Sequence, residues 1–266
     1  MPKDRPIEKV DAYFGDFTKQ IARAIKKKGK VKILDAGCGF GVAMMGFVKR
    51  FGDKVEMMGY NYSKHDGNLV TAKKESIKKG IFTKKELSKI KNLPKFIYCD
   101  ASKKLPFKDN TFDFIYSMAS VYLYDDKIHF LDECNRILKK DGIARISPSF
   151  EKHERIYLQK AGSKKKEWIY LPECYQNYWE IWDKGKEVKI WDYCNKIKGV
   201  KAVWKNRYKG DKPMYIEVKG NRKVDFKLRF ISSIDLNFIW KKFGGVKSIY
   251  TTQLKKSFEP RYKKDR

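Results

Sequence analysis

The segment KILDAGCGFGVAM, residues 32–44, carries glycines on three alternate positions, Gly37, Gly39 and Gly41. An apolar, β-rich run precedes the glycines and a second apolar run follows them. This order predicts a strand, a tight loop and a helix, with the glycines letting a ligand approach the backbone closely. Val42 stands where a dinucleotide fingerprint has its third glycine, and no Gly-Lys-Ser/Thr follows, so the loop matches neither pyrophosphate-binding pattern.

Strand-like and helix-like runs alternate from this segment to about residue 147. After the first strand, strand-like runs lie at residues 55–60, 95–100, 112–118 and 143–147, and a helix is expected over residues 126–142. Such alternation predicts an α/β fold with a doubly wound, mostly parallel sheet and right-handed crossovers. In such sheets the ligand lies at the carboxyl ends of the strands, where the glycine loop is also expected.

The change in this rhythm divides the chain into four segments. We expect an N-terminal helical segment at residues 1–30, a ligand-binding core at 31–147, an inserted segment at 148–230, and a return to the core with a basic tail at 231–266. The inserted segment interleaves aromatic residues with lysines and is expected to be α+β, with a hairpin near its end. A late helix at 232–244 and a strand at 246–254 are expected to rejoin the core.

Charge is the most unusual bulk property of the chain. Lys and Arg number 61 against 32 Asp and Glu, a formal net charge of +29. This field would attract polyanions such as RNA, DNA or an anionic membrane surface, although attraction alone does not define a function. No apolar run approaches the roughly 20 residues of a membrane span. The five cysteines form no C-x-x-C pair and the three histidines have no ligand spacing, so we expect reduced thiols, a cytoplasmic protein and no metal.

The glycine segment resembles the first motif of class I S-adenosylmethionine-dependent methyltransferases. Further stretches resemble later motifs of that family in the expected order, namely MMGYNYS, FIYCDASKKLPFKDNTFDFIYS, ILKKDGIARIS and RFISSIDLNFIWKKFGGVKSI. The resemblance covers about residues 31–147 and 229–254, and is nearest to the branch that acts on small molecules and lipids. It implies a Rossmann-like, seven-stranded-type sheet, S-adenosylmethionine as cofactor and S-adenosylhomocysteine as product.

The resemblance also implies roles for individual residues. The three loop glycines would lie against the methionine and ribose parts of the cofactor, with Cys38 between them, and Asp35 would orient the loop or meet the methionine amino group. The site would be completed by residues at the ends of the next strands: Asn61, Tyr62, Asp100, Ala101, Ser117 and Met118.

Three of these positions carry specific expectations. Asp100 would accept a hydrogen bond from the adenine amino group, and Ser117 with its neighbour would flank the methyl donor. Asn61 stands where the family usually has Asp or Glu, which holds both ribose hydroxyls; an uncharged amide can accept one such hydrogen bond.

Three functions are left open: methylation of a small molecule or lipid, methylation of RNA, and nucleic-acid binding without catalysis. The motif set favours a small-molecule or lipid acceptor, whereas the charge and interleaved aromatics suit RNA. A third alternative is a non-catalytic nucleic-acid-binding module, because Asn61 lacks the usual charge. The donor is already electrophilic, so the enzyme mainly aligns the reactants, and no residue is identified as a catalytic base. The inserted segment is expected to form the acceptor site and its lid.

Overall fold

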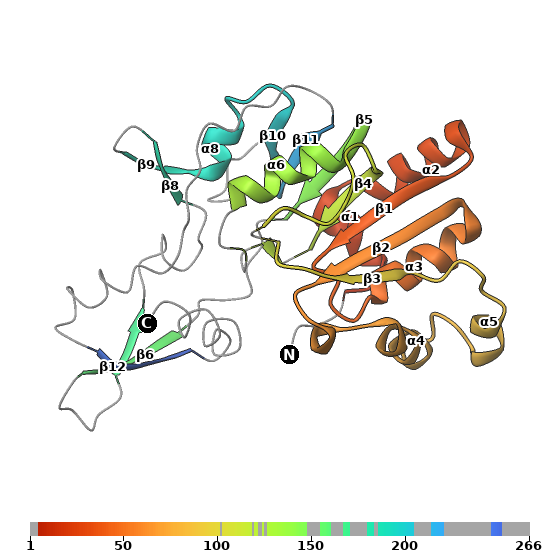
Figure 1. Ribbon diagram of the computed structural model, residues 1–266, viewed down its shortest axis with the longest axis horizontal. Coiled ribbons are helices and arrows are strands. Elements are labelled where there is room, and N and C mark those ends of the chain that lie inside the picture. Colours follow the sequence, from red (N-terminus) through yellow and green to blue (C-terminus); the bar gives the residue numbers. More distant parts are fainter. Residues whose placement is uncertain are drawn as a thin grey trace.

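The computed structural model describes residues 5–101, 103–118, 120–121, 124, 127–147, 155–160, 167–170, 180–183, 186–204, 214–220 and 246–251. Its main body is a seven-stranded sheet with the order β10-β11-β5-β4-β1-β2-β3 (Figure 1). The strands are β1 Val31–Ala36, β2 Val55–Asn61, β3 Lys95–Tyr98, β4 Phe112–Ser117, β5 Leu138–Ile146, β10 Val200–Val203 and β11 Tyr215–Lys219.

Strands β1 to β5 pair in parallel, and β11 is antiparallel to both β5 and β10. The expected mostly parallel, seven-stranded Rossmann-like sheet is therefore confirmed. The connecting helices are α1 Glu8–Phe14, α2 Phe17–Lys28, α3 Val42–Phe51, α4 Leu69–Lys78, α5 Lys84–Ser88, α6 Lys127–Ile137 and α8 Ile190–Cys194, with short 3-10 turns η1 Gly52–Lys54 and η2 Lys64–Asp66. No helix in the described part of the chain is long and apolar enough to cross a membrane.

Each face of the sheet buries its own apolar core. Successive residues of β1 alternate between them, because neighbouring side chains on a strand point to opposite faces: Ile33 packs with α1, α2 and α3, and Leu34 packs with α6 and α8. Both side chains are fully buried. The helices on the two faces thus fix the strands, and with them the loop that follows β1.

Two helix caps show how local sequence determines where elements begin. The Thr-x-x-Glu pattern at Thr83 and Glu86 is typical of a helix start, and each side chain bonds the other residue's backbone N–H at the start of α5. The chain after Ser63 forms two separate helical elements. Ser63 caps η2, and α4 begins after Asn68, whose side chain accepts a hydrogen bond from the Thr71 N–H.

The expected boundaries differ from the structure in two further places. The helix expected to reach residue 142 ends at Ile137, and β5 begins at Leu138, earlier than the expected strand at 143–147. Strand β11, expected as one arm of a hairpin in the inserted segment, pairs with β5 and with β10, a strand that was not expected, and these two strands complete the main sheet. Because β11 pairs with a strand far away in the sequence, the periodicity within the inserted segment does not reveal this pairing.

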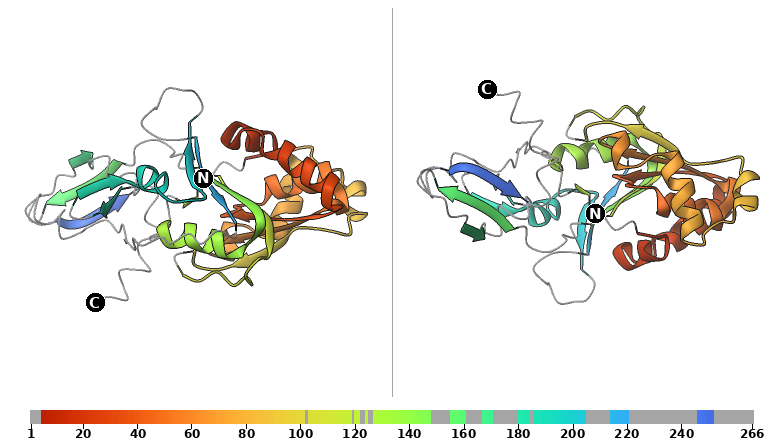
Figure 2. Two further views of the ribbon diagram at one scale, coloured as in Figure 1. Left: turned by 90° about the horizontal axis from the view of Figure 1, so that it is seen from above. Right: turned by 90° about the horizontal axis from the view of Figure 1, so that it is seen from below.

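The remaining described strands form two small sheets. Strand β12 Val246–Thr251 pairs with β6 Arg155–Lys160, which pairs with β7 Glu167–Tyr170, and β8 Glu180–Asp183 pairs with β9 Lys186–Lys189. Figures 1 and 2 show these strands apart from the seven-stranded sheet. The late strand thus joins β6 and not the core sheet. The late helix expected at 232–244 lies outside the described residues, and the division into four segments stays a prediction.

The Asp113 carboxylate joins three elements at the edge where the parallel strands begin. Its oxygens accept hydrogen bonds from Lys28 Nζ at 2.9 Å, Lys139 Nζ at 2.8 Å and the Lys32 N–H at 2.9 Å. Its side chain is 2% exposed. Burial alone would raise the pKa of Asp113, but these bonds outweigh it and hold the pKa below the ordinary value.

We predict that Asp113→Asn lowers the free energy of unfolding at pH 7 by about 1 to 2 kcal/mol, since both lysines remain partly hydrated. Because the folded-state pKa is depressed, this stabilisation is present above the unfolded-state pKa, about 3.9, and disappears as the pH falls through the folded-state value. Urea unfolding as a function of pH measures the difference. The exposed Asp53→Asn change is the control; equal effects of the two changes at pH 7 would contradict the prediction.

Candidate functional site

The carboxyl ends of four parallel strands meet around the glycine loop. The loop follows β1. The end of β2 contacts the loop, since Gly37 and Cys38 donate their N–H groups to Tyr60 O, both at 3.0 Å. The end of β4 contacts the last residue of β1, since Ser117 Oγ donates to Ala36 O at 2.9 Å. The end of β3 adjoins β2, since the Cys99 N–H donates to Asn61 O at 3.0 Å. The structure thus brings together the strand ends on which the site was predicted.

The glycine loop has a backbone that only glycine adopts readily. Gly37, Gly39 and Gly41 have φ of 75°, 53° and 80°, all in the left-handed region. The N–H groups of the loop point toward protein acceptors. Those of Gly37 and Cys38 donate to Tyr60 O, that of Gly41 donates to Cys38 O, and that of Gly39 donates to Asn61 Oδ1. A phosphate-binding loop turns its N–H groups toward the anion. This loop instead presents its backbone as a close-fitting surface, which agrees with its departure from the pyrophosphate patterns.

The side chain of Asn61 pairs with both backbone groups of Gly39. Asn61 Oδ1 accepts from the Gly39 N–H at 2.8 Å, and Asn61 Nδ2 donates to Gly39 O at 2.8 Å. Nδ2 also donates to Gly67 O at 3.3 Å, and Asn61 is only 4% exposed. The last residue of β2 is therefore bonded to the middle of the loop that follows β1.

The turn after β2 packs directly on the same glycine. A Cβ atom on Gly67 would lie 2.0 Å from Gly39 O, so that this position admits no side chain while the loop keeps its shape. Residues 63–67 are held as a compact turn by the Asp66 carboxylate, which accepts from the Ser63 N–H at 3.0 Å. Sequence reasoning missed Gly67, although a glycine shortly after a strand end is a recognisable sign of close backbone approach.

Four hydroxyl groups line the opposite side of the loop, and we call them the hydroxyl cluster: Tyr60, Ser117, Ser120 and Tyr124. Ala36 O accepts from Ser117 Oγ and from Ser120 Oγ at 2.8 Å, and these two oxygens lie 2.6 Å apart. Ser120 Oγ is 3.3 Å from the Tyr124 hydroxyl, which accepts from the Tyr60 hydroxyl at 3.0 Å. Except for Ser117, this cluster was not expected from the sequence, because it depends on the path of the chain after β4.

The hydroxyl cluster is uncharged at neutral pH. Burial, reinforced by the neighbouring Tyr124, raises the pKa of Tyr60 well above its ordinary value. Burial likewise raises the pKa of Tyr124, although hydrogen bonds with Ser120 and Tyr60 oppose the shift. These phenols therefore act as hydrogen-bonding groups beside the loop and not as phenolate bases.

The structure separates the predicted site residues into buried supports and accessible groups. Asp35, Cys38, Ala101, Ser117 and Met118 are all less than 10% exposed. The Asp35 carboxylate accepts from the Tyr116 hydroxyl at 2.8 Å, and burial together with Asp35 raises the pKa of Tyr116 well above its ordinary value.

Two predicted residues are more accessible. Asp100 is partly exposed after β3, and Tyr62 is 57% exposed after β2. These two side chains can therefore meet a ligand directly, whereas Asp35 and Ser117 lie below the surface, where they can position the strand ends.

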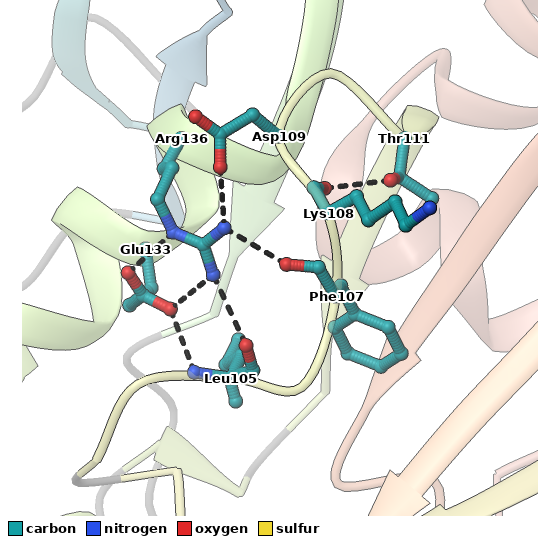
Figure 3. A network of polar contacts seen from close by, with 7 residues as sticks. All are labelled: Leu105, Phe107, Lys108, Asp109, Thr111, Glu133 and Arg136. Carbon is teal, nitrogen blue, oxygen red and sulfur yellow. Dashed lines mark hydrogen bonds and ion pairs between the residues drawn. The ribbon is translucent and has the colours of Figure 1, made fainter.

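The connection from β3 to β4 is anchored by Arg136 and Glu133 on α6 (Figure 3). Arg136 donates to Leu105 O at 3.1 Å, to Phe107 O at 2.8 Å and to Glu133 Oε2 at 2.6 Å, and Glu133 Oε2 accepts from the Leu105 N–H at 2.7 Å. Burial would raise the pKa of Glu133, but the Arg136 guanidinium holds it below its usual value. This network fixes the segment that begins at Asp100.

Replacement of Gly37 by Ala tests how tightly the hydroxyl cluster packs on the loop. A Cβ atom there would lie 2.4 Å from both Cβ and Oγ of Ser120, in addition to the cost of a positive φ. Gly29 has a φ of 79° with open space around it, so Gly29→Ala carries the backbone cost alone, about 1 to 2 kcal/mol. We expect Gly37→Ala to lower the free energy of unfolding by at least about 1 kcal/mol more than Gly29→Ala in urea titrations. Equal losses would contradict this packing.

Comparison with known proteins identifies the part of the chain that holds this site. Residues 34–146 match a family model described as a methyltransferase domain, which spans the chain from β1 to the end of β5. No curated protein matches the chain at a significant level.

Solved structures that resemble the chain are distant from it. The YcgJ protein of Bacillus subtilis is 23% identical over 48% of this chain and 50% of its own, with a TM-score of 0.35. A proposed sarcosine dimethylglycine methyltransferase from Galdieria sulphuraria is 22% identical over 52% of this chain and 46% of its own, with a TM-score of 0.37. A proposed S-adenosylmethionine-dependent methyltransferase from Methanococcus maripaludis is 23% identical over 53% of this chain and 59% of its own, with a TM-score of 0.36. The chain thus matches about half the length of these structures.

Proposed function

We propose that residues 34–146, which match a methyltransferase domain, form a class I S-adenosylmethionine-dependent methyltransferase. We further propose that the chain transfers the methyl group to a small-molecule or lipid-like acceptor. Domains of this family use S-adenosylmethionine. The observation that carries the proposal is the meeting of the β1, β2, β3 and β4 ends around a glycine loop with inward-turned N–H groups. That surface suits a cofactor without phosphates.

The residues present can be assigned to parts of the cofactor. The surface of the glycine loop would meet its methionine and ribose parts, and Asp100 would accept from the adenine amino group beside the exposed Tyr62 ring. The cofactor supplies a methyl group on a positively charged sulfur, which is electrophilic without further activation. The chain's own residues then need to align the acceptor and exclude water.

The hydroxyl cluster supplies hydrogen bonds and not a catalytic base. The raised pKa values of Tyr60 and Tyr124 keep both phenols protonated at neutral pH. An alcohol acceptor would require a base other than these two phenols, whereas a thiol or an uncharged amine needs no phenolate to react.

A small acceptor is favoured by the motif resemblance alone, because the described lysines do not separate a small acceptor from RNA. Exposed Lys30 and Lys54 directly precede β1 and β2, at the edge of the sheet opposite the glycine loop, whereas exposed Lys64 and Lys103 follow the ends of β2 and β3. The net charge of +29 makes RNA methylation the second candidate function.

Calorimetric titration with S-adenosylhomocysteine tests the cofactor assignment. We expect the wild type to bind, and Gly39→Val to weaken binding by at least about 100-fold, because a branched side chain at a φ of 53° distorts the ligand-facing loop. Gly52→Val, at a φ of 61° with open space around it, is the control and should bind as the wild type does. A folded wild type that binds no S-adenosylhomocysteine would instead support the non-catalytic module.

Transfer of labelled methyl groups to fractionated cell extract distinguishes the acceptors. We expect label in a low-molecular-weight or lipid fraction, unaffected by ribonuclease and nearly independent of salt. Label in a ribonuclease-sensitive fraction, lost steeply as salt rises, would overturn the small-acceptor proposal in favour of RNA.

A further inference from the structure

We infer that Asn61 is a positioning residue that holds the glycine loop through Gly39, and that it does not capture the cofactor ribose. This inference rests on the proposed function, because it concerns the same site. The resemblance places at this position the Asp or Glu that normally holds two ribose hydroxyls. Here the side chain is turned into the protein, where it is 4% exposed.

The hydrogen-bonding capacity of the Asn61 amide is almost completely used. An amide offers two donor hydrogens and one acceptor oxygen with two lone pairs. Nδ2 donates to Gly39 O at 2.8 Å and to Gly67 O at 3.3 Å, and Oδ1 accepts from the Gly39 N–H at 2.8 Å. One lone pair of Oδ1 remains, which is less than a ribose diol requires and much less than a carboxylate provides.

The pairing with Gly39 explains why an amide stands at this position. The side chain meets one donor and one acceptor of the same residue, so it must present both kinds of atom in one plane. An ionised Asp is the same size but has only acceptors. Its second oxygen would face the carbonyl oxygens of Gly39 and Gly67, which now accept hydrogen bonds from Nδ2.

Asn61→Asp therefore distinguishes a positioning role from ribose capture by the sign of its effect. If Asn61 were a weakened ribose ligand, Asp would restore the family's usual carboxylate and tighten binding. If it holds the loop, ionised Asp repels Gly39 O and loosens the loop. A protonated Asp, by contrast, again has one donor and one acceptor, so it can reproduce the amide's bonds to Gly39 at acidic pH.

The experiment measures S-adenosylhomocysteine binding and thermal stability of the full chain at pH 8 and pH 5.5. We expect Asn61→Asp to weaken binding at least about tenfold at pH 8, with most of the loss recovered at pH 5.5, because a buried carboxyl group protonates readily. Asn68→Asp is the matched control. It adds the same charge seven residues away, where Oδ1 caps α4 by accepting from the Thr71 N–H at 3.0 Å, a role that Asp fills equally well.

Comparison with the control removes the effects of other titrating groups. Those near Asn61 in the chain, the loop or the sheet include Tyr60, Tyr62, Lys64, His65 and Asp66 around the end of β2, Cys38 in the loop, and Tyr98, Cys99 and Asp100 at the end of β3. All of them are shared by the wild type and both variants, so the ratio of dissociation constants at each pH isolates position 61.

A second ligand tests the ribose directly. The loss of affinity caused by Asn61→Asp at pH 8 should be the same, within about threefold, for S-adenosylhomocysteine and for its 2′-deoxyribose analogue, because the side chain acts on the loop. Tighter binding by Asn61→Asp, or a loss that disappears with the deoxy analogue, would overturn the inference. A folded wild type that binds neither ligand would instead overturn the proposed function.

Discussion

The pairing between the Asn61 amide and the backbone of Gly39 connects the end of β2 to the loop that follows β1. A loop with three glycines has a large conformational entropy, because each glycine populates both signs of φ. Two hydrogen bonds to one buried side chain remove much of that freedom at the loop's centre. Gly67 must also be glycine, since its backbone lies against the carbonyl that Asn61 holds.

The hydroxyl cluster constrains the loop from its other side. Ser117 and Ser120 both donate to Ala36 O, the last carbonyl of β1, and Ser120 fills the space that a side chain at Gly37 would need. The loop is thus held between the turn after β2 and the segment after β4. A site held in this way is preorganised, so that ligand binding requires little ordering of the backbone. This arrangement places rigid backbone where close ligand contact is expected.

Much of the core could be predicted from sequence because its signals are local. Alternating strand and helix runs predict β1 to β4, and the Thr83–Glu86 pair predicts the start of α5. The place of β11 in the main sheet could not be predicted, because its pairing with β5 depends on contacts across more than 60 residues. The partner of Asn61 was missed for the same reason: position 61 marks a ligand site by analogy, but only the fold shows that its amide faces Gly39.

The most direct test of this account is a crystal structure of the chain with S-adenosylhomocysteine bound. We expect the ligand to lie across the carboxyl ends of β1, β2 and β3, over the glycine loop. The Asn61 amide should remain within hydrogen-bonding distance of both the N–H and the carbonyl of Gly39, as it is here at 2.8 Å for each. A ligand bound elsewhere, or an Asn61 side chain turned away from Gly39 to the ribose hydroxyls, would contradict it.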